Sequence, residues 1–359
     1  MTSPAEPHPP RRAAVVGTGL IGGSIGLALR AQGWHVTGRD RDPAHMEAAL
    51  ARGAIDAVGD DPEAEVTFVA TPVGAIATEA ATALKGPGVV TDVGGVKSSI
   101  VATVDDDRFV GGHPMAGSEQ DGVEAADPLL FSGAVWVLTP VATTDPRAHS
   151  LVRSVVTSLG AEVLELAPED HDAMVAVVSH VPHLAAAALM GLAAERATAH
   201  SALLRLAAGG FRDMTRVAGG DPGIWPDICT ENATAIVELL SALEADLAAM
   251  RRRVAGDDRP GILEALQRAR TARMQLPGKV AGPEAMAELR VPVPDRPGVL
   301  SEITTLASEL GVNIDDLEIA HSSEGEAGVV ILLVRSASAE RLAGALRTRG
   351  YHPVHRSRG

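Results

Sequence analysis

The stretch Ala13–Ser24 constrains the fold more than any other part of the sequence. It begins with four small apolar residues, which are typical of a buried strand, and continues with the pattern G-x-G-x-x-G where a helix should begin. In a dinucleotide-binding unit the first glycine makes a tight turn, the second lets the backbone approach a pyrophosphate, and the third lets helix and strand pack closely. The free N–H groups of the helix N-terminus then face the phosphates. The pattern predicts cofactor contacts from Gly17, Gly19, Leu20, Ile21 and Gly22.

The residues that follow fit a βαβ unit. The predicted helix ends at Gly33, a second strand spans His35–Gly38, and Asp40 stands where a ribose-binding acid belongs. A carboxylate there favours NAD over NADP, because it repels a 2′-phosphate. Arg39 and Arg41 flank this acid, however, and either can hold a phosphate. A structural βαβ unit without a ligand is the alternative interpretation.

Composition limits the class of protein. A chain of 359 residues is expected to form two or three domains, and a net charge of −15 argues against a nucleic-acid partner. Cys229 is the single cysteine, so no internal disulfide forms and the cytoplasm is the expected compartment. Met1–Pro10 lacks the apolar region of a signal peptide and is expected to be a disordered tail. No uncharged apolar run is expected to reach the roughly 18 residues of a membrane span.

Patterning along the chain predicts three folded parts. Short β-type runs alternate with helical patterns over residues 11–168, which indicates a Rossmann-type, doubly wound parallel sheet of the α/β class. Residues 169–276 read as helical, 277–283 as a linker, and 284–359 as a small α+β domain of βαββαβ order, which is ferredoxin-like. In the first part the predicted strands are residues 13–17, 35–38, 65–70, 88–92, 109–111, 134–138 and 162–165.

Polar residues gather at the carboxyl ends of three predicted strands, where open α/β sheets bind ligands. Thr71 and Pro72 form a rigid turn that would pass beside the nicotinamide ribose, and Asp92 ends the next strand. His113 follows a third strand, within plausible reach of a bound nicotinamide. The glycines and proline around this histidine favour a functional role over that of an ordinary loop residue.

The helical part carries its own candidates. His171–Ala197 is apolar on more than one face, so a partner subunit is expected to cover it and to make the helical part the core of a homodimer. Pro182 should kink this helix, and His180 and His183 could share a face. No third ligand for a metal is evident beside these two histidines, and no metal is expected. Arg212 and Arg216, four residues apart, are either solvated charges or a clamp for carboxylates.

Together these motifs resemble the prephenate/arogenate dehydrogenase family with a C-terminal ACT domain. The similarity runs from about residue 12 to 353, and its most specific parts are His113–Glu119 and Gly209–Arg216. The other matching stretches are Gly17–Ser24, Ala70–Val73, Asp92–Lys97, Ser179–His183, Asp221–Trp225 and Asp295–Leu300.

The resemblance implies an NAD-dependent oxidative decarboxylation of prephenate to 4-hydroxyphenylpyruvate, one step before tyrosine. It implies that His113 is the base for the ring hydroxyl, that Arg216 grips a substrate carboxylate and that His183 contacts the substrate. Glu119 matches a carboxylate that can pair with this arginine as a gate. The substrate-binding residues implied in this way are Ser118, Glu119, Arg212, Asp213 and Gly95, and Arg212 and Asp213 are expected to complete the pocket, either within one chain or across the dimer.

One position departs from the family pattern. Gly95 stands where the family usually has a serine whose hydroxyl meets the substrate hydroxyl and the catalytic histidine. Ser98, Ser99 or a water would have to replace it, or His113 is oriented differently.

The resemblance also implies a regulatory site in the C-terminal domain, with tyrosine as the expected effector. The domain alternatively only braces the catalytic dimer. The residues expected to bind the effector are Asp295, Arg296, Pro297, Gly298, Val299 and Asn313.

Other functions remain open from the sequence. An arogenate dehydrogenase would form tyrosine directly, and the residues do not separate it from a prephenate dehydrogenase. A β-hydroxyacid dehydrogenase usually carries a catalytic lysine in its helical domain, and His171–Leu206 contains none. A non-catalytic amino-acid sensor is the most distant alternative.

Overall fold

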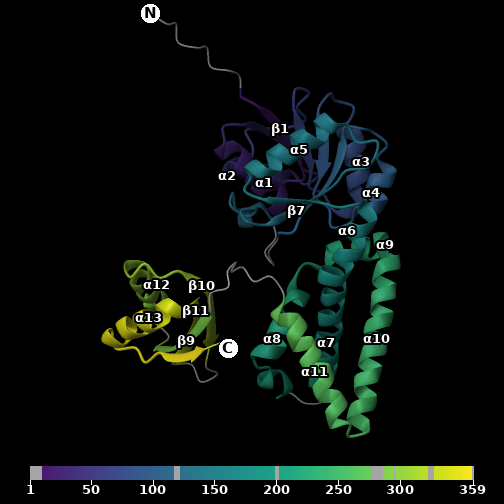
Figure 1. Ribbon diagram of the computed structural model, residues 1–359. Coiled ribbons are helices and arrows are strands. Elements are labelled where there is room, and N and C mark those ends of the chain that lie inside the picture. Colours follow the sequence, from purple (N-terminus) through teal and green to yellow (C-terminus); the bar gives the residue numbers. More distant parts are fainter. Residues whose placement is uncertain are drawn as a thin grey trace, which may run out of the picture. The chain divides into compact units, whose positions relative to one another are not determined.

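The computed structural model describes residues 10–116, 122–198, 202–275, 286–294, 296–321 and 327–357 (Figure 1). Its backbone contacts divide the chain into two compact units, Met1–Ala248 and Ala249–Gly359. The division falls inside one long helix, α10 (Ala233–Ala255), rather than at a predicted linker.

The first unit contains an eight-stranded sheet of order β3-β2-β1-β4-β5-β6-β7-β8. Neighbouring strands from β3 to β6 are parallel, which confirms the doubly wound class, whereas β7 runs antiparallel to β6 and β8 is parallel to β7. A parallel return needs a helical crossover, and the described residues between β6 and β7 hold one 3₁₀ turn, η1 (Val123–Ala125). The strands are β1 (Arg12–Val16), β2 (His35–Arg39), β3 (Ala57–Val58), β4 (Val66–Val69), β5 (Val89–Asp92), β6 (Phe109–Pro114), β7 (Val135–Thr139) and β8 (Glu162–Glu165).

The strands differ from the predicted ones at two places, and the second concerns the site. Strand β3 was not predicted, because two residues are too short a run to show a pattern. Strand β6 extends three residues beyond its predicted end, so His113 lies within a strand and not after it. The pairing of His113 with Val137 of the antiparallel β7 accounts for the extension.

Helices cover the sheet of the first unit (Figure 1). Asp42 and Asp145 cap the N-termini of two of them by accepting backbone N–H bonds, and a proline follows each. Trp136 lies in the core against the rings of Phe68 and Phe131, at centroid distances of 6.3 and 5.0 Å. The helices are α1 (Leu20–Ala31), α2 (Pro43–Arg52), α3 (Val73–Ala83), α4 (Ser98–Thr103) and α5 (Pro146–Ser158).

The rest of the first unit is helical. The disturbance expected at Pro182 is a π-helical segment, Ala176–His180, which directly precedes α7; the proline lacks the N–H that a regular helix would use there. Helix α9 ends at Glu231 and α10 begins at Ala233, and the side chain of Asn232 between them bonds to other segments. The elements are α6 (Pro168–Val175), η2 (Ala176–His180), α7 (Val181–Ala197), η3 (Leu203–Leu206), α8 (Gly209–Thr215), η4 (Arg216–Gly219), η5 (Pro222–Ile224), α9 (Trp225–Glu231) and α10.

The continuous helical stretch Pro168–Ala197 is long and apolar enough to cross a membrane by length and composition. The expectation that no such run exists is therefore wrong, because serine and histidine interrupt the apolar residues without adding a charge. One helix of this kind is weak evidence for a membrane protein, since core helices pass the same test.

The second unit contains α11 (Arg259–Met274) and a four-stranded antiparallel sheet of order β10-β11-β9-β12. The βαββαβ succession is the predicted one. Leu289, Ile303, Leu332 and Leu342 are fully buried in its core. The elements are β9 (Met286–Pro294), α12 (Val299–Glu309), β10 (Ile314–His321), β11 (Ala327–Arg335), α13 (Ser336–Thr348) and β12 (Val354–Ser357).

Candidate active site

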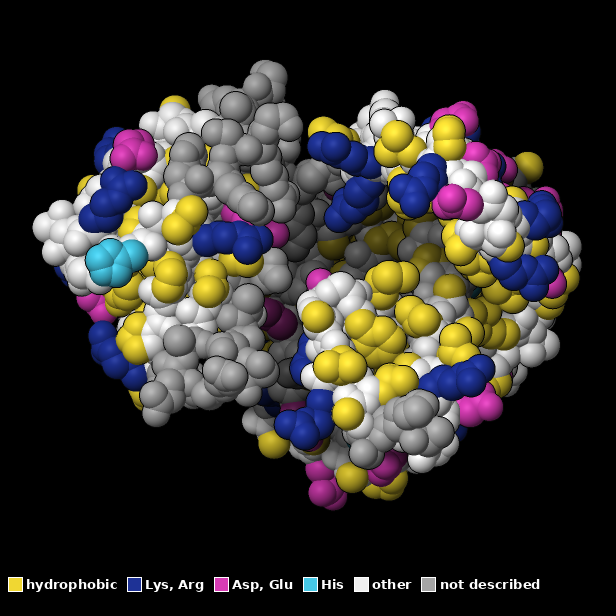
Figure 2. All heavy atoms as spheres, turned by 90° about the horizontal axis from the view of Figure 1, so that it is seen from below, with side chains coloured by type: hydrophobic (Ala, Val, Ile, Leu, Met, Phe, Trp, Pro, Cys, Tyr) yellow, Lys and Arg dark blue, Asp and Glu magenta, His cyan; other side chains and the backbone are white. Residues whose placement is uncertain are grey.

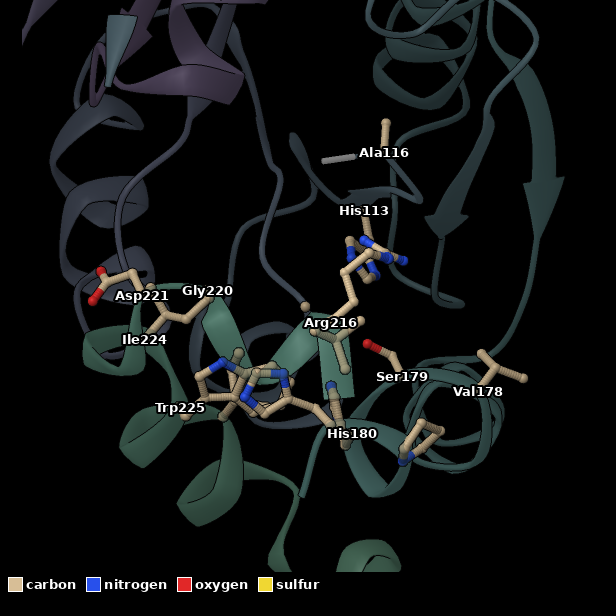
Figure 3. Close-up of a pocket in the computed structure, with 15 residues that line it drawn as sticks. His113, Ala116, Val178, Ser179, His180, Arg216, Gly220, Asp221, Ile224 and Trp225 are labelled. Carbon is tan, nitrogen blue, oxygen red and sulfur yellow. The ribbon is translucent and has the colours of Figure 1, made fainter. Parts of the chain in front are cut away.

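A cavity of about 570 Å³ lies in the first unit, between the carboxyl edge of the sheet and the helical part (Figure 3). The sheet side contributes His113 of β6 and Gly95 of the loop after β5. The helical side contributes residues from the π segment, α7, η4 and the start of α9, among them Ser179, His180, His183, Arg216 and Trp225. The sequence therefore predicted four residues that meet in this cavity: His113, Gly95, His183 and Arg216.

A chain of hydrogen bonds runs from His113 away from the cavity. His113 Nδ1 lies 2.9 Å from His171 Nε2, and His171 Nδ1 lies 2.8 Å from Asp172 Oδ1. The Asp172 carboxylate also accepts the backbone N–H groups of Lys97 and Ser98, each at 2.8 Å. An ionised carboxylate only accepts, so His171 carries its proton on Nδ1 and accepts from His113 Nδ1–H through Nε2. The lone pair of His113 Nε2 is thereby left free.

Charge and burial keep this histidine neutral. Burial lowers the pKa of His113 well below its usual value, and His171 and Lys97 lower it further. Burial raises the pKa of Asp172, but hydrogen bonds from His171 and from Ser98 and Lys97 outweigh it, and the net pKa lies below the ordinary range. The arrangement holds an ionised aspartate behind two histidines, the second of which presents a basic nitrogen near Gly95.

Space beside that nitrogen is open. A Cβ built on Gly95 would lie 3.9 Å from both Nε2 and Cε1 of His113, which is ordinary contact distance. Of the suggested replacements for the family serine, Ser98 uses its backbone N–H and hydroxyl on Asp172. The Ser99 hydroxyl is buried and has no hydrogen-bond partner among the described residues. Neither serine lines the cavity.

Asp92 was predicted to contact the cofactor, and the geometry gives it another role. It is fully buried, and its carboxylate accepts from the backbone N–H groups of Gly94 at 2.9 Å and Gly112 at 3.0 Å. It also pairs with the buried ammonium of Lys97, which donates to the Gly112 carbonyl at 2.8 Å. Burial lowers the pKa of Lys97, and Asp92 opposes that shift. The Asp92–Lys97 pair fixes the peptide directly before His113. The carboxylate oxygens of Asp92 are therefore committed to protein donors.

Aromatic contacts order the helical side of the cavity. The His183 ring stacks on Trp225 at 3.5 Å and 15°, and the His180 ring meets the same indole edge-on at 6.2 Å. His180 Nδ1 lies 3.2 Å from the Asn232 amide, which also donates to the carbonyl of Asp172 at 2.9 Å. Burial lowers the pKa of His180 to about 4 and also lowers that of His183. Among the described residues, no group of three or more candidate metal ligands gathers.

The predicted pair of arginines does not form a clamp within one chain. Arg216 lines the cavity, but Arg212 and Asp213 do not, and both are exposed. The Arg212 guanidinium donates to the carbonyl of Ala207 at 3.1 Å. The α-helical spacing on which the prediction rested ends at Thr215, where the backbone changes to a 3₁₀ turn. Ser118 and Glu119 lie outside the described residues.

The glycine loop has the geometry of a dinucleotide cradle. Gly17 has φ +91°, and a Cβ on it would lie 2.3 Å from the Ala70 carbonyl oxygen. A Cβ on Gly22 would lie 1.9 Å from the carbonyl oxygen of Gly17, so only glycine fits at either position. Gly19 faces open space and begins α1, which starts at Leu20 and Ile21 without a side-chain cap. Uncapped N–H groups beside open space suit a pyrophosphate.

The Asp40 carboxylate lies against this loop. It accepts the backbone N–H groups of Thr18 at 2.8 Å and of Asp42 at 3.0 Å. Burial raises the pKa of Asp40, but these hydrogen bonds outweigh it, and the net pKa is lowered. The group is therefore ionised at neutral pH and retains free lone pairs for ribose hydroxyls.

The two flanking arginines differ. Arg39 forms ion pairs with Asp60 at 2.8 Å and Glu79 at 2.6 Å, so its charge is already matched by two carboxylates. Arg41 is exposed.

A second aspartate of the helical part contacts the sheet edge. After β4, Thr71 and Pro72 lead into α3, and the Thr71 hydroxyl is buried without a hydrogen-bond partner among the described residues. The backbone N–H of Gly74, in the first turn of α3, donates to Asp227 Oδ2 at 3.2 Å. The sequence reasoning missed Asp227, as it missed His171, Asp172 and Asn232, because these contacts join segments from distant parts of the sequence.

The loop that begins α12 was predicted to bind an effector. Gly298 has φ +93°, a conformation that favours glycine, although a Cβ there would meet nothing within 4 Å. Glu302 in the first helical turn accepts from the Tyr351 hydroxyl at 2.8 Å and lies 3.6 Å from Arg296. Of the other predicted residues, Pro297 and Asn313 are exposed, Val299 is buried, and Asp295 lies outside the described residues.

Comparison with family models gives three consecutive matches. Residues 25–165 match the model of the prephenate dehydrogenase nucleotide-binding domain, and residues 167–268 match that of the prephenate dehydrogenase dimerization domain. Residues 287–349 match the ACT domain.

Individual relatives agree with these models. A prephenate dehydrogenase of Bacillus subtilis is 34% identical over 339 residues, which are 90% of this chain and 91% of the relative. A solved structure of the Aquifex aeolicus prephenate dehydrogenase, in complex with hydroxyphenyl propionate and NAD⁺, has a TM-score of 0.70 and 31% identity, and the match covers 76% of this chain and all of that one. The structure of a Synechocystis arogenate dehydrogenase has a TM-score of 0.64 and 32% identity, covering 74% of this chain and 99% of that one.

Proposed function

This chain belongs to the prephenate dehydrogenase family, as an NAD-binding oxidoreductase of tyrosine biosynthesis with a C-terminal ACT domain, and we propose that it acts on prephenate. The reaction is oxidative decarboxylation to 4-hydroxyphenylpyruvate. The observation that carries the proposal is the neutral His113, whose free Nε2 lone pair faces a cavity that also holds Arg216.

His113 acts as the general base in this proposal. Bound NAD would supply the acceptor for the hydride that leaves the ring carbon bearing the hydroxyl. His113 Nε2 takes the hydroxyl proton as that carbon becomes a carbonyl carbon. Carbon dioxide leaves from the opposite ring carbon, and the ring becomes aromatic.

His171 and Asp172 are positioning residues. The buried carboxylate fixes the proton of His171 on Nδ1, and His171 in turn fixes that of His113 on its own Nδ1. The base is thus oriented with its lone pair toward the substrate before any substrate binds, as a carboxylate orients the histidine of a hydrolase triad.

The helical side binds the substrate's acidic groups. Arg216 offers a planar guanidinium that can pair bidentately with a carboxylate. His183, held flat against Trp225, presents its ring edge to the same cavity. A product-like hydroxyphenyl propionate, which the Aquifex aeolicus relative holds, should bind here as well.

Prephenate and arogenate differ in one group: a keto group in the first and an ammonium in the second. Among the described residues that line the cavity, Asp221 is the one carboxylate that an ammonium would seek. It accepts from the backbone N–H of Gly223 at 2.8 Å, and Figure 3 shows it directed away from His113 and Arg216. This orientation supports prephenate as the preferred substrate.

The test is the rate of NADH formation, followed by absorbance, with each substrate in turn. We expect kcat/KM for prephenate to exceed that for arogenate. A larger value for arogenate would replace the proposed substrate, and no NADH from either would refute the activity.

For the cofactor we propose a preference for NAD over NADP. Asp40 is ionised and would repel a 2′-phosphate, and Arg39 is occupied by Asp60 and Glu79. Comparing kcat/KM for the two cofactors tests this, and a higher value for NADP would point to phosphate binding by Arg41.

We also propose that the helical part forms a homodimer. Only 22% of the apolar window within Pro168–Ala197 is buried inside the chain, and Met174, Val177, Val178 and Leu192 are each more than half exposed. Figure 2 shows hydrophobic side chains gathered over the helical part, the part that matches a dimerization domain. Sedimentation at micromolar concentration should give a dimer. A fully active monomer would contradict the proposal.

The ACT domain supports regulation, and we propose tyrosine as its effector because the reaction lies one step before it. The uncapped N-terminus of α12 after Gly298 suits a carboxylate. Tyrosine should inhibit the full chain, and Arg296→Ala should weaken that inhibition with little effect on turnover. Equal inhibition of both proteins would place the tyrosine site in the catalytic cavity.

We propose the cytoplasm as the compartment, and domain boundaries at residues 11–168, 169–276 and 284–359.

A further inference from the structure

We propose that Asp227 is a positioning residue that couples cofactor binding to substrate binding, by tying the helical wall of the cavity to the first turn of α3. The inference rests on the proposed function, because it takes the two ligand sites from there.

The contact itself is specific. The backbone N–H of Gly74 donates to Asp227 Oδ2 at 3.2 Å, across 153 positions of sequence. Helix α3 starts after Pro72, which has no side-chain acceptor, and no side chain from its own turn caps it. Asp227 supplies the missing carboxylate at the positive end of the helix dipole. A Cβ on Gly74 would lie 2.8 Å from that oxygen, so a side chain at this position would displace the Asp227 carboxylate from its present place.

Each end of the contact is part of a ligand site. On one side, α3 continues from the Thr71–Pro72 turn, where the buried Thr71 hydroxyl lacks a partner among the described residues, as expected for a group that meets a ribose. On the other side, Asp227 lies two residues after Trp225, which stacks on His183 and lines the cavity. The next residue, Ile228, lines the cavity too. A ligand that moves either end therefore acts on the Asp227–Gly74 bond.

Asp172 makes a matching contact that serves as a fixed reference. It too is an aspartate of the helical part, and its carboxylate accepts the N–H groups of Lys97 and Ser98 at the start of α4. Asp172 is 5% exposed and makes several bonds, whereas Asp227 is only partly buried and makes one longer bond among the residues that the structure describes. The contact of Asp172 has too many hydrogen bonds to change with ligand state. The contact of Asp227 is weak enough to form or break, and coupling needs an interaction that differs between states.

The experiment measures coupling directly. The probe is 3-(4-hydroxyphenyl)propionate, titrated calorimetrically into the full chain with and without saturating NAD. We expect NAD to tighten binding of the probe to the unsubstituted protein by about 5–150-fold. In Asp227→Ala this factor should fall to near 1, while the affinity for either ligand alone changes by less than about threefold. In the reciprocal titration, the probe should tighten NAD binding to the unsubstituted protein by the same factor, and in Asp227→Ala it should no longer do so.

Two further variants keep the test decisive. Gly74→Ala keeps Asp227 but places a Cβ 2.8 Å from its Oδ2, which displaces the carboxylate and should lower the coupling in the same direction. Glu231→Gln, at an exposed glutamate at the end of the same helix, is the matched control and should leave the coupling intact. Coupling retained in Asp227→Ala and Gly74→Ala, or absent from the unsubstituted protein, would overturn the inference. Failure of the proposed function is distinguishable, because the unsubstituted protein would then form no NADH from prephenate.

Discussion

The two sides of the cavity are built in different ways. On the sheet side, Gly95 and His113 follow or end neighbouring strands, and the backbone of the parallel sheet brings them to one edge. On the helical side, His183, Arg216 and Trp225 come from three separate helical elements, and side-chain contacts bring them together. The sheet side holds His113, the proposed base. The helical side holds the residues proposed to recognise the substrate and to keep the base oriented.

Because the two sides are built independently, substitutions can separate effects on the chemical step from effects on substrate binding. A substitution on the sheet side should change the chemical step and leave binding of the substrate largely intact. A substitution on the helical side should change binding, pH dependence or stability first.

The largest effect is expected for His113→Asn. Asparagine cannot take the hydroxyl proton, so kcat should fall by roughly 10²–10⁴-fold. The affinity for NAD, measured by titration, should stay nearly unchanged because the glycine loop is untouched. A variant that keeps most of its activity would remove His113 from the role of base.

Arg216→Ala tests the other side. Loss of a charge-assisted, bidentate contact costs on the order of 2–4 kcal/mol, so KM for prephenate should rise strongly. Steady-state kinetics at saturating NAD measure it, with Arg212→Ala as the matched control, since Arg212 does not line the cavity. If Arg212→Ala raises KM as much as Arg216→Ala, the partner subunit brings Arg212 to the site.

His180 lies on the helical side and takes no part in the proposed chemistry, so its effect should appear in the free energy of unfolding. Burial lowers the pKa of His180 from 6.5 to about 4, so the unfolded chain binds a proton in this range while the folded chain does not. Stability is therefore full above pH 6.5 and is lost as the pH falls toward 4, by about 3 kcal/mol for this group. Urea unfolding at pH 7 and at pH 4.5 should show a smaller loss in His180→Gln than in the unsubstituted protein. Equal losses would mean that His180 does not resist protonation.

His171 links the two sides, and His171→Phe should break that link. The phenyl ring fills the space but cannot accept from His113 Nδ1, so the base is no longer held in one tautomer. We expect kcat to fall by about 10–100-fold, as for other residues that orient a functional histidine. The acid limb of the kcat profile, which reports protonation of His113, should also move, and a purely structural role would leave that limb in place.

The same contrast explains how much the sequence could predict. Local patterns located the glycine loop, Asp40, His113 and the βαββαβ unit, because turns, caps and strand ends are determined by neighbouring residues. Gly95 and Arg216 were found from motif resemblance and meet in the cavity. Asp92 was placed beside the cofactor because strand ends usually face ligands, but nearby backbone amides and Lys97 take its oxygens.

What the sequence could not give are contacts between distant segments. The hydrogen bonds that join His113 to His171 and Asp172 were not predicted, although both residues lie at the start of a predicted helix. Nothing local shows that His171 Nε2 lies 2.9 Å from His113 Nδ1. Arg212 likewise does not join Arg216 in the cavity within one chain, because its guanidinium donates to the carbonyl of Ala207. Tertiary packing decides such details.

The smallest effect is expected at Gly95, the sheet-side position that departs from the family. A Cβ there would sit 3.9 Å from His113 Nε2, so Gly95→Ser fits without strain and places a hydroxyl beside the base. One added hydrogen bond contributes about 0.5–1.5 kcal/mol, so kcat should rise by about 2–10-fold while KM changes little. Gly95→Ala fills the same space without the hydroxyl and should show no gain, which separates hydrogen bonding from packing. A loss of activity in both variants would mean that the substrate ring occupies this space, and that the absence of a side chain at Gly95 is itself part of how the sheet side admits its substrate.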